Sequence, residues 1–296
     1  MKSVKRKALA HIRMAVIYTL LLILGFVYLY PICYALLQSF MSPEDIHNPM
    51  VHFVPSLFTL DNYRLLLDRM GYFASIGYSS YLSAASSLIS ALACGLMGYA
   101  LSRFDFKLKK LYLALILTCF IIPPQVLMIP TYLGYSQLGL LGSEAAFFLP
   151  AALGQGLKSP IFILIFYSFF NTIPKSLDEA GKIDGCSPLH VFIRILAPLT
   201  IPAFTLVFIF STVWYWNETY LTSLYIGDSV RTLPNSIALV LSSLEEEAMR
   251  DPMMARINLP IRMASVILAI IPLIVFYLIL QRQFVESIDR TGITGE

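Results

Sequence analysis

The chain has 296 residues, of which 57% are hydrophobic and 13% are charged, about half of the ~25% charge that is typical of soluble domains. The formal net charge is +3. No run of Lys and Arg is interleaved with aromatic residues as a nucleic-acid groove requires. The composition therefore argues against a soluble domain or a nucleic-acid-binding protein and favours a chain that lies in a lipid bilayer.

Long apolar segments predict six membrane-spanning helices, because a helix needs about 20 mostly apolar residues to cross a bilayer. The predicted spans are Met14–Phe40, Phe73–Ser102, Leu111–Leu133, Ala145–Phe170, Leu199–Leu224 and Leu259–Gln281. Several contain proline, which packed membrane helices tolerate. The sequence thus predicts an all-α integral membrane protein with an N-terminus at 1–13, a six-helix transmembrane domain at 14–281 and a tail at 282–296.

Basic residues near the ends of the spans predict the orientation. With the N-terminus inside, fourteen Lys and Arg residues fall in inner segments and six fall in the longer outer ones. Both termini are therefore predicted to be cytoplasmic. The run that begins at Met14 is too long for the apolar core of a signal peptide and no Ala-x-Ala-like site follows it, so we interpret it as the first span.

The outer loops predict two short helices, at residues 60–67 and 233–240. We interpret the run Glu245-Glu246-Glu247 that follows the second helix as a solvated face. The four cysteines are scattered and are interpreted as small hydrophobic residues rather than as a disulfide framework or a metal site.

The inner segment 171–198 predicts a helical hairpin. Ser176 and Glu179 fit a capping box, Gly185 permits the left-handed turn that ends a helix, and Ser187 before a proline starts the next helix. An apolar stripe follows, formed by Leu189, Phe192, Ile193 and Leu196. The pattern leaves two interpretations open, a hairpin that lies on the membrane surface and a hairpin that docks on a protein partner.

Few charges interrupt the spans, and an ionisable group within a membrane is a candidate functional residue. Lys158 interrupts the fourth span and Glu218 ends the uncharged part of the fifth. They could pair or face a water-filled vestibule, or Lys158 could snorkel outward.

An aromatic and polar cluster lies close to Glu218, at Trp214, Tyr215, Trp216 and Asn217. Aromatic rings stack on sugar C–H faces, and amides bond hydroxyls. However, Trp and Tyr also anchor helices at membrane interfaces, and we expect that role for Trp214 and Tyr215. The candidate residues of a pore or substrate path are Lys158, Trp216, Asn217 and Glu218.

Several motifs of the sequence together resemble a known family. Permeases of ABC importers carry a cytoplasmic loop written EAA, three residues, Gly, nine residues, Ile-x-Leu-Pro, and the matching positions are Glu179, Ala180, Gly185, Ile195 and Pro198. Gly181 and Ala197 depart from the motif. Further short motifs resemble those of carbohydrate permeases of the maltose-transporter type. They are Asn62-Tyr63, Tyr99–Phe104, Pro123–Gln125, Ile173–Lys175, Trp216-Asn217 and Gln281–Val285. Their order extends the resemblance along nearly the whole chain.

The resemblance implies a type I ABC importer permease fold in a bacterial cytoplasmic membrane. It also implies a second homologous permease, two ATP-binding subunits and an extracytoplasmic solute-binding protein that delivers a carbohydrate. No cofactor is implied for this chain, because it lacks a Gly-x-x-x-x-Gly-Lys-Ser/Thr loop. ATP and Mg would be bound by the partner ATPase.

The same resemblance implies two sets of contacts with the ATPase. The coupling residues would be Glu179, Ala180, Gly181, Asp184, Gly185, Ile195 and Pro198. The contacts of the C-terminal tail would be Gln281, Arg282 and Phe284. Because Gly181 replaces an alanine with another small residue, we expect docking to survive. A glycine within a helix costs roughly 1 kcal/mol, so the hairpin would be softer.

Three other classes of membrane protein make different predictions for this sequence. An ATP-independent secondary carrier would place ionisable residues at the membrane midplane and discontinuous helices at the interface of its repeats. No Asp or Glu lies in the centre of any predicted span, which counts against this class. A membrane enzyme would need a nucleophile with its base or a metal set, but all four histidines lie outside the predicted spans. An ABC permease for amino acids or peptides would share the inner loop at 171–198. Only the short motifs on either side of that loop favour a carbohydrate as the substrate.

Overall fold

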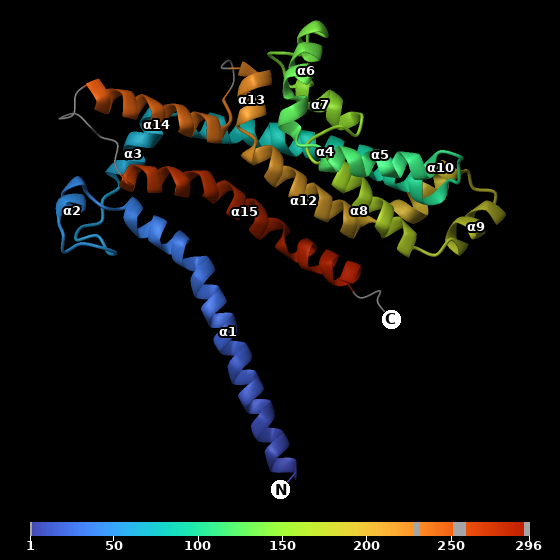
Figure 1. The fold of residues 1–296 in the computed structure, drawn as a ribbon, viewed down its shortest axis with the longest axis horizontal. Coiled ribbons are helices and arrows are strands. Elements are labelled where there is room, and N and C mark those ends of the chain that lie inside the picture. The colour runs from blue at the N-terminus through green and yellow to red at the C-terminus, as the bar shows by residue number, and fades with distance from the viewer. Residues whose placement is uncertain (1, 228–230, 251–258, 293–296) are drawn as a thin grey trace. The chain divides into compact units, whose positions relative to one another are not determined.

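The computed structural model describes residues 2–227, 231–250 and 259–292, and in this part of the chain every regular element is a helix. The helices belong to two compact units, residues 1–71 with 237–271 and residues 72–236 with 272–296. Figure 1 labels the helices along the chain.

The first unit is built around the end of a long helix. Its helices are α1 (Lys2–Ser39), α2 (Pro43–His47), α3 (Asp61–Arg69) and parts of α14 (Leu233–Arg250) and α15 (Leu259–Gly292). The last carbonyls of a helix lack intrahelical partners, and here Asn62 Nδ2 donates to the carbonyls of Ser39, at 3.0 Å, and Met41, at 2.9 Å. Asn62 therefore fastens α3 to the end of α1.

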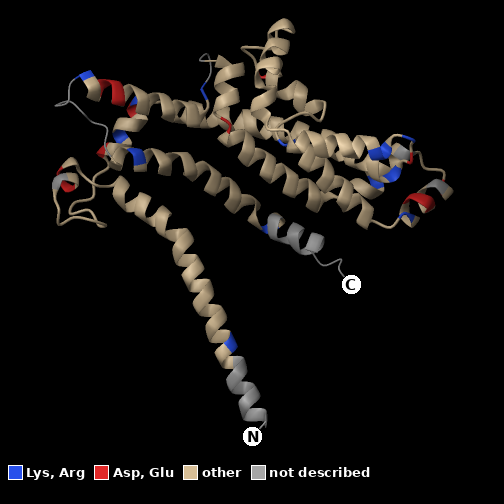
Figure 2. Cartoon of the chain, viewed as in Figure 1, with Lys and Arg blue, Asp and Glu red and all other residues tan. Residues whose placement is uncertain are grey.

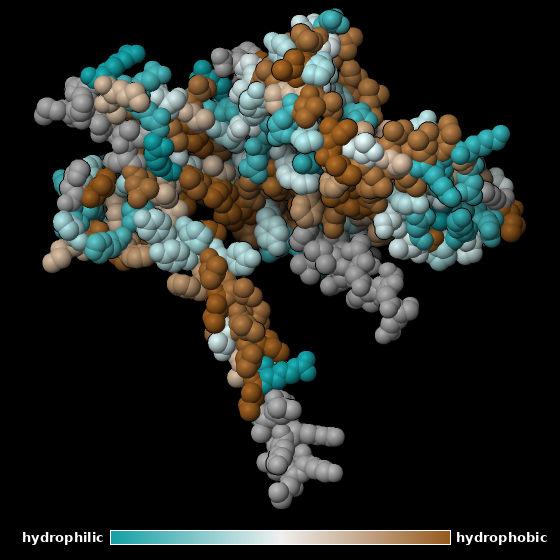
Figure 3. Space-filling model, viewed as in Figure 1, coloured by the Kyte–Doolittle hydropathy of each residue, from teal (hydrophilic) through white to brown (hydrophobic). Residues whose placement is uncertain are grey.

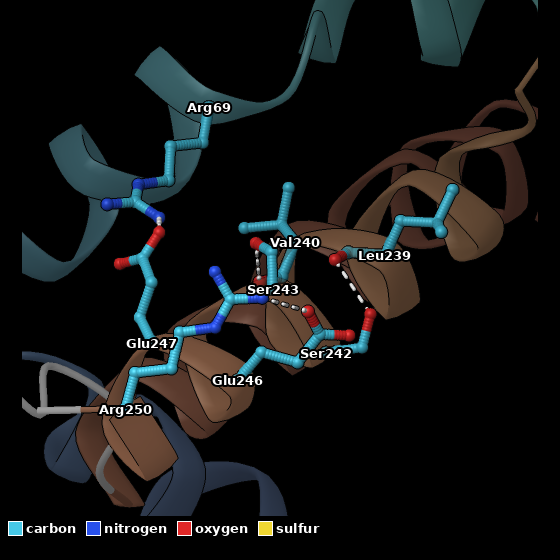
Figure 4. Close-up of polar contacts among 8 residues, drawn as sticks. All are labelled: Arg69, Leu239, Val240, Ser242, Ser243, Glu246, Glu247 and Arg250. Atoms are coloured by element: carbon cyan, nitrogen blue, oxygen red, sulfur yellow. Dashed lines mark hydrogen bonds and ion pairs between the residues drawn. The ribbon is translucent and has the colours of Figure 1, made fainter.

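Ion pairs join the helices of this unit. The guanidinium of Arg69 on α3 lies 2.6 Å from the carboxylate of Glu247 on α14 (Figure 4), and this hydrogen bond raises the pKa of Arg69. The other pairs of the acidic run are Glu246 with Arg250 and Glu245 with Arg262. The expected solvated face is therefore a row of paired carboxylates, and each exposed pair contributes about 0–1 kcal/mol. The predicted helix at 233–240 continues to Arg250.

The second unit holds most of the spans. Its helices are α4 (Tyr72–Arg103), α5 (Lys109–Ile121), α6 (Pro124–Gln137), α7 (Ala145–Ala152), α8 (Ser159–Thr172), α9 (Ser176–Ile183), α10 (Pro188–Val191), the π-helix η1 (Phe192–Leu196), α11 (Ala197–Leu199), α12 (Ile201–Asn217) and α13 (Tyr220–Tyr225). Within the unit α4 packs against α7, α8 and α12. The core between them is formed by aromatic side chains of α8, above all Phe162, Phe166 and Phe170, with Val207 of α12.

Small residues allow α4 to approach α8 closely. The buried side chains of α4 are mostly Ser, Ala and Gly. A Cβ added at Gly98 would lie 2.5 Å from Phe166 Cβ and 2.9 Å from the backbone nitrogen of Tyr167. Membrane helices associate through such small residues because lipid supplies no hydrophobic force between helices.

Three of the six predicted spans are continuous helices, and the other three are broken. By length and composition, α1, α4 and α15 could each cross a membrane, and the described residues hold up to five spans if each bent pair is counted as one. The third predicted span divides into α5 and α6, which meet at 100°, because Pro124 cannot continue the hydrogen-bond ladder of α5. The fourth divides into α7 and α8, and the fifth ends at Asn217. The count of six is not confirmed, and the orientation of the termini stays a prediction.

Charged residues are distributed unevenly along the second unit. Figure 2 shows α8 and α12 free of charged side chains, whereas blue and red residues gather around α9 and α10. The space-filling view has the same pattern, with teal side chains near α9 (Figure 3). The hairpin is thus the polar end of apolar helices.

Candidate functional site

The inner segment folds as the predicted helical hairpin between α8 and α12, and its first helix ends as the sequence predicts. After Ile183 the chain turns at Gly185, whose φ is +78°, a value that favours glycine. The backbone N–H of Cys186 donates to the carbonyl of Gly181 at 2.9 Å, which is the hydrogen bond of a Schellman ending.

The two helix starts differ in how well the sequence predicted them. Ser187 caps α10, since its Oγ accepts from the backbone N–H of His190 at 3.3 Å. The first helical bond of α9 runs from the N–H of Glu179 to the carbonyl of Lys175 at 3.1 Å. Lys175 is therefore the N-cap and Ser176 the first helical residue. The start lies one position earlier than predicted, within the usual uncertainty of helix boundaries.

Gly181 is buried between the two arms of the hairpin. A Cβ at this position would lie 2.8 Å from Val191 Cγ2 and 3.5 Å from Ile195 Cδ1. Val191 is buried and β-branched, so its side chain has little freedom to move away. The close approach that requires a small residue is therefore inside this chain. It lets α9 close on α10. The expected docking on a partner and the softer hairpin stay predictions.

The predicted apolar stripe divides between two faces. Leu196 is fully buried and Phe192 packs on the same core, whereas Leu189 and Ile193 are exposed. The stripe was predicted from the 3.6-residue period of an α-helix, and the π-helix η1 breaks that period between residues 192 and 196. Ile183, which is 86% exposed, is a further apolar side chain of the hairpin that faces solvent.

The π-helix has a local cause in Pro198. The N–H of Ala197 donates to the carbonyl of Phe192, five residues back. Pro198 has no N–H, and in a regular helix its ring would meet the carbonyl of Arg194, so a widened turn relieves the clash. The segment Leu189–Leu199 then bends by 73° into α12. The hairpin and α12 are thus joined directly through this bend.

A buried ion pair fastens α9 to the end of α4. Arg103 Nε lies 3.0 Å from Asp178 Oδ2, and the two side chains are 6% and 14% exposed. The two atoms are not aligned for a hydrogen bond, so the contact is electrostatic. The guanidinium also donates to the carbonyl of Ile173 at 3.0 Å. Sequence analysis included Arg103 among the inner basic residues and in the Tyr99–Phe104 motif but assigned no role to Asp178, because the two residues lie 75 positions apart along the chain.

A cavity of about 170 Å³ lies beside this ion pair. It is lined by Tyr99, Arg103, Phe104, Lys175, Asp178, Glu179 and Val191. Of the residues implied to couple, Glu179 therefore stands at its edge with an exposed side chain. The others are placed as follows: Ala180, Asp184, Gly185 and Pro198 are exposed, Ile195 is half-buried and Gly181 is buried.

The candidates for a substrate path do not lie together. Lys158 lines a second cavity, of about 230 Å³, that is formed by residues of α5 to α8, α12 and α13. The side chain of Trp216 is buried, and Asn217 is exposed with Nδ2 bonded to the carbonyl of Val213. Glu218 Oε1 accepts from the backbone N–H of Leu221 at 2.8 Å and so caps α13. Only Lys158 of the four lines the cavity.

Tyr215 is buried within the chain, and its hydroxyl accepts from the backbone N–H of Leu157 at 3.1 Å. Its expected place at a membrane interface stays a prediction. The sequence missed Tyr215 as a cavity residue. The burial of a tyrosine in an aromatic run depends on the loop at 153–158, which no pattern in α12 reveals.

The C-terminal segment continues the last helix, since α15 runs to Gly292. Gln281 and Arg282 are exposed on it. The side chain of Phe284 lies outside the described part of the structure. Among the described residues, no group of His, Cys, Asp and Glu is arranged to hold a metal ion.

Several apolar helices with a polar helical hairpin between two of them define a multi-pass membrane protein. The chain belongs to the family described as binding-protein-dependent transport system inner membrane component, whose model matches residues 88–290.

Relatives support this assignment, and a solved structure has the same fold. The chain is 31% identical over 288 residues to the polygalacturonan/rhamnogalacturonan transport system permease protein YtcP of Bacillus subtilis (strain 168), covering 94% of this chain and 97% of the relative. It is 28% identical to the arabinooligosaccharides transport system permease protein AraQ of Halalkalibacterium halodurans, covering 92% and 93%. A chain of a bacterial ABC transporter for the acidic polysaccharide alginate shares the fold, with a TM-score of 0.73 at 21% identity over 93% of this chain and 97% of that one.

Proposed function

We propose that this chain is a permease subunit of an ATP-driven ABC importer for a carbohydrate, an oligosaccharide or a sugar derivative. Relatives named for polygalacturonan, arabinooligosaccharides and starch degradation products support the substrate class. The chain forms half of a translocation pore with a second, homologous permease in the cytoplasmic membrane of a bacterium. An extracytoplasmic solute-binding protein delivers the sugar.

The observation that carries the coupling role is the exposed face of the hairpin. Glu179 is accessible to a partner beside a cavity, and three apolar side chains on the same hairpin, Ile183, Leu189 and Ile193, are left uncovered. Exposed apolar side chains rimmed by polar ones are typical of protein interaction sites. One of two ATP-binding subunits seats on this face, and those subunits hold ATP and Mg.

The same hairpin offers a route for movement. Its first arm continues from α8 and its second arm continues through the bend at residue 200 into α12. The pair of Arg103 and Asp178 adds a tie to α4. Closure of the ATP-binding subunits therefore moves three helices of the pore together.

Affinity purification from mild detergent tests the assignment. The tagged chain should co-purify with an ATP-binding subunit and a second permease. Glu179→Lys should still insert in the membrane but lose both the ATP-binding subunit and sugar uptake. The matched control is Glu44→Lys, an exposed carboxylate on α2 outside the hairpin, which should retain both.

Two results would count against the proposal. Normal uptake by Glu179→Lys would remove the coupling role. A wild-type chain that purifies alone, and that shows no ATP-dependent uptake when candidate subunits are co-expressed, would favour a secondary carrier. Uptake of amino acids or peptides by an intact complex would keep the importer and replace the substrate class.

A further inference from the structure

The larger cavity of the second unit carries a single charge. Its lining includes five aromatic residues and several polar ones, among them Thr131 and Gln155, but Lys158 is the one charged residue of the lining. Within the described part of the chain no carboxylate lies within ion-pair distance of Lys158. Glu218 does not line the cavity, and its carboxylate bonds the backbone of Leu221. Lys158 is exposed, and its ammonium lies over Trp214, which is not a lining residue, so the cation stands at the edge of the cavity, where it favours an anion.

The loop that carries Lys158 is held in one conformation. Gly154 turns the chain with φ of +69°. The hydroxyl of Tyr215 bonds the N–H of Leu157 at 3.1 Å, and a Cβ at Gly156 would lie 2.5 Å from the same hydroxyl oxygen. The Tyr215 hydroxyl therefore contacts the loop at two successive residues, Gly156 and Leu157. This support is the kind of preorganisation that a binding site needs.

Lys158 itself has an unusual backbone. Its φ is +58°, and it is the one non-glycine residue with positive φ in the described part of the chain. Glycine or asparagine adopts this conformation at less cost than lysine does, so backbone geometry does not explain the lysine. Strained residues concentrate at binding and switch sites. The Nζ atom lies 5.5 Å from the centroid of the Trp214 ring, a cation–π distance, so the ammonium rests on an aromatic face.

The rest of the lining suits a sugar ring. Tyr135 and Tyr225 meet edge to face at 5.1 Å, and Phe147 packs on Tyr225 and Tyr215. These rings offer apolar surface for C–H faces, while the tyrosine hydroxyls and Gln155 offer hydrogen bonds. The volume of about 230 Å³ is just below the range of about 300–1,000 Å³ found for small-molecule sites. It fits one sugar unit rather than several.

We propose that this cavity binds a single acidic sugar unit, with the ammonium of Lys158 holding its carboxylate and the tyrosine rings holding its ring. The inference rests on the proposed function and narrows it from carbohydrates to carbohydrates that carry a carboxylate. The site lies on this chain itself, whatever the second permease contributes to the pore.

The test uses the purified transporter in nanodiscs and the fluorescence of tryptophan. The chain has two tryptophans, and Trp216→Phe leaves Trp214, beside Lys158, as the reporter of this chain. Trigalacturonic acid is titrated against maltotriose, a neutral sugar of the same length. Trigalacturonic acid should give a saturable change that weakens with added salt, and maltotriose should bind more weakly.

Two substitutions separate the charge from the fold. Lys158→Asn keeps a residue that tolerates the left-handed backbone and removes the cation, so it should weaken binding of trigalacturonic acid about 10- to 100-fold, as expected for a charge-assisted bond. Lys158→Arg should retain most of the binding. Binding of maltotriose should be unchanged in both. Lys110→Asn, which removes an exposed lysine of α5, is the control for net charge.

The outcomes distinguish this inference from the proposed function. Equal affinities for the two sugars, or an equal loss of both in Lys158→Asn, would overturn the acidic-sugar site. Uptake of maltotriose without uptake of trigalacturonic acid would overturn it as well and leave the carbohydrate importer standing. A transporter that binds an ATP-binding subunit but takes up no sugar would overturn both the acidic-sugar site and the proposed carbohydrate import.

Discussion

The helices α1 and α4 are similar in length and both are apolar enough to cross a membrane, yet they are packed very differently. Of the most apolar window in each, 6% of the residues of α1 and 44% of those of α4 are buried within the chain. The side chains explain the difference. α1 presents large residues such as Leu22 and Tyr28 to its surroundings, whereas the buried face of α4 is made of Ser, Ala and Gly.

The comparison separates two properties that hydropathy alone combines. Apolar length decides whether a helix can enter a bilayer, and small residues decide whether it packs against other helices. On this basis α4 is the fixed centre of the second unit. Within its own unit α1 leaves large side chains such as Leu22 and Tyr28 uncovered. Substitutions in the two helices should therefore have unequal effects.

The largest effect is expected where the packed helix meets the hairpin. Arg103→Gln leaves Asp178 as a buried charge without its cation, and loss of one member of such a pair costs about 3–5 kcal/mol. Thermal unfolding in detergent should show the loss. Because the pair ties α4 to α9, the assembled transporter should also hydrolyse more ATP for each sugar imported.

The matched control is an exposed pair, Glu246 with Arg250 on α14, where Arg250→Gln should change stability by under about 1 kcal/mol. An Arg103→Gln protein as stable as this control would show that the buried tie contributes little. A stable protein with an unchanged ratio of ATP hydrolysed to sugar imported would remove its role in coupling.

A second effect comes from adding one methyl group to three glycines. At Gly98 the new Cβ would meet Phe166 Cβ at 2.5 Å and neighbouring backbone atoms at 2.9–3.0 Å, and overpacking of this kind costs about 1–3 kcal/mol. At Gly77 in α4 and Gly25 in α1 no other atom lies within 4 Å of the new Cβ. Alanine there should be neutral or stabilise by up to about 1 kcal/mol.

Thermal unfolding of the three alanine variants in one detergent tests whether the cost depends on contact with α8. Gly98→Ala should have the lowest Tm, and Gly77→Ala should match Gly25→Ala. If Gly77→Ala were as damaging as Gly98→Ala, the helix as a whole rather than its contact with α8 would be intolerant of change.

A glycine of the hairpin is also closely packed, and we expect its replacement by alanine to lower the stability by a smaller amount. In Gly181→Ala the added Cβ would meet Val191 Cγ2 at 2.8 Å, and we expect a loss of about 1 kcal/mol because the contact is with a side chain rather than with backbone. The damage should shrink when Val191 is also changed to alanine. A double-mutant cycle measures the coupling, which for residues in contact is about 0.5–3 kcal/mol. Additive effects of the two substitutions would contradict the direct contact.

The sequence predicted the features that depend on local chemistry. Composition and capping residues predict the continuous helices α1, α4 and α15 and the turn at Gly185, and the structure has each of them. The count of six spans is not confirmed. The breaks in the third, fourth and fifth predicted spans were not predicted. Proline within a membrane helix is compatible with either a mild kink or a sharp bend, and the surrounding packing decides between them.

The candidate site was predictable only in part. The coupling residues were found through a motif, and their functional role stays a prediction. Two contacts join residues that are far apart in sequence. They are the ion pair of Arg103 with Asp178 and the hydrogen bond from the Leu157 N–H to the Tyr215 hydroxyl. No periodicity reports such pairs. Lys158 was noticed as a charge in an apolar run, but its cavity and its left-handed backbone belong to the tertiary structure.

The smallest effect is expected in α1. Leu22 is 75% exposed, so Leu22→Ala in the isolated chain should change stability by under about 0.5 kcal/mol. The same change at Leu82 of α4, which is 2% exposed, should cost about 2–5 kcal/mol. Unfolding of the two variants in detergent compares them directly. A large loss for Leu22→Ala in the assembled transporter, absent from the isolated chain, would show that a partner subunit rather than lipid covers this face of α1.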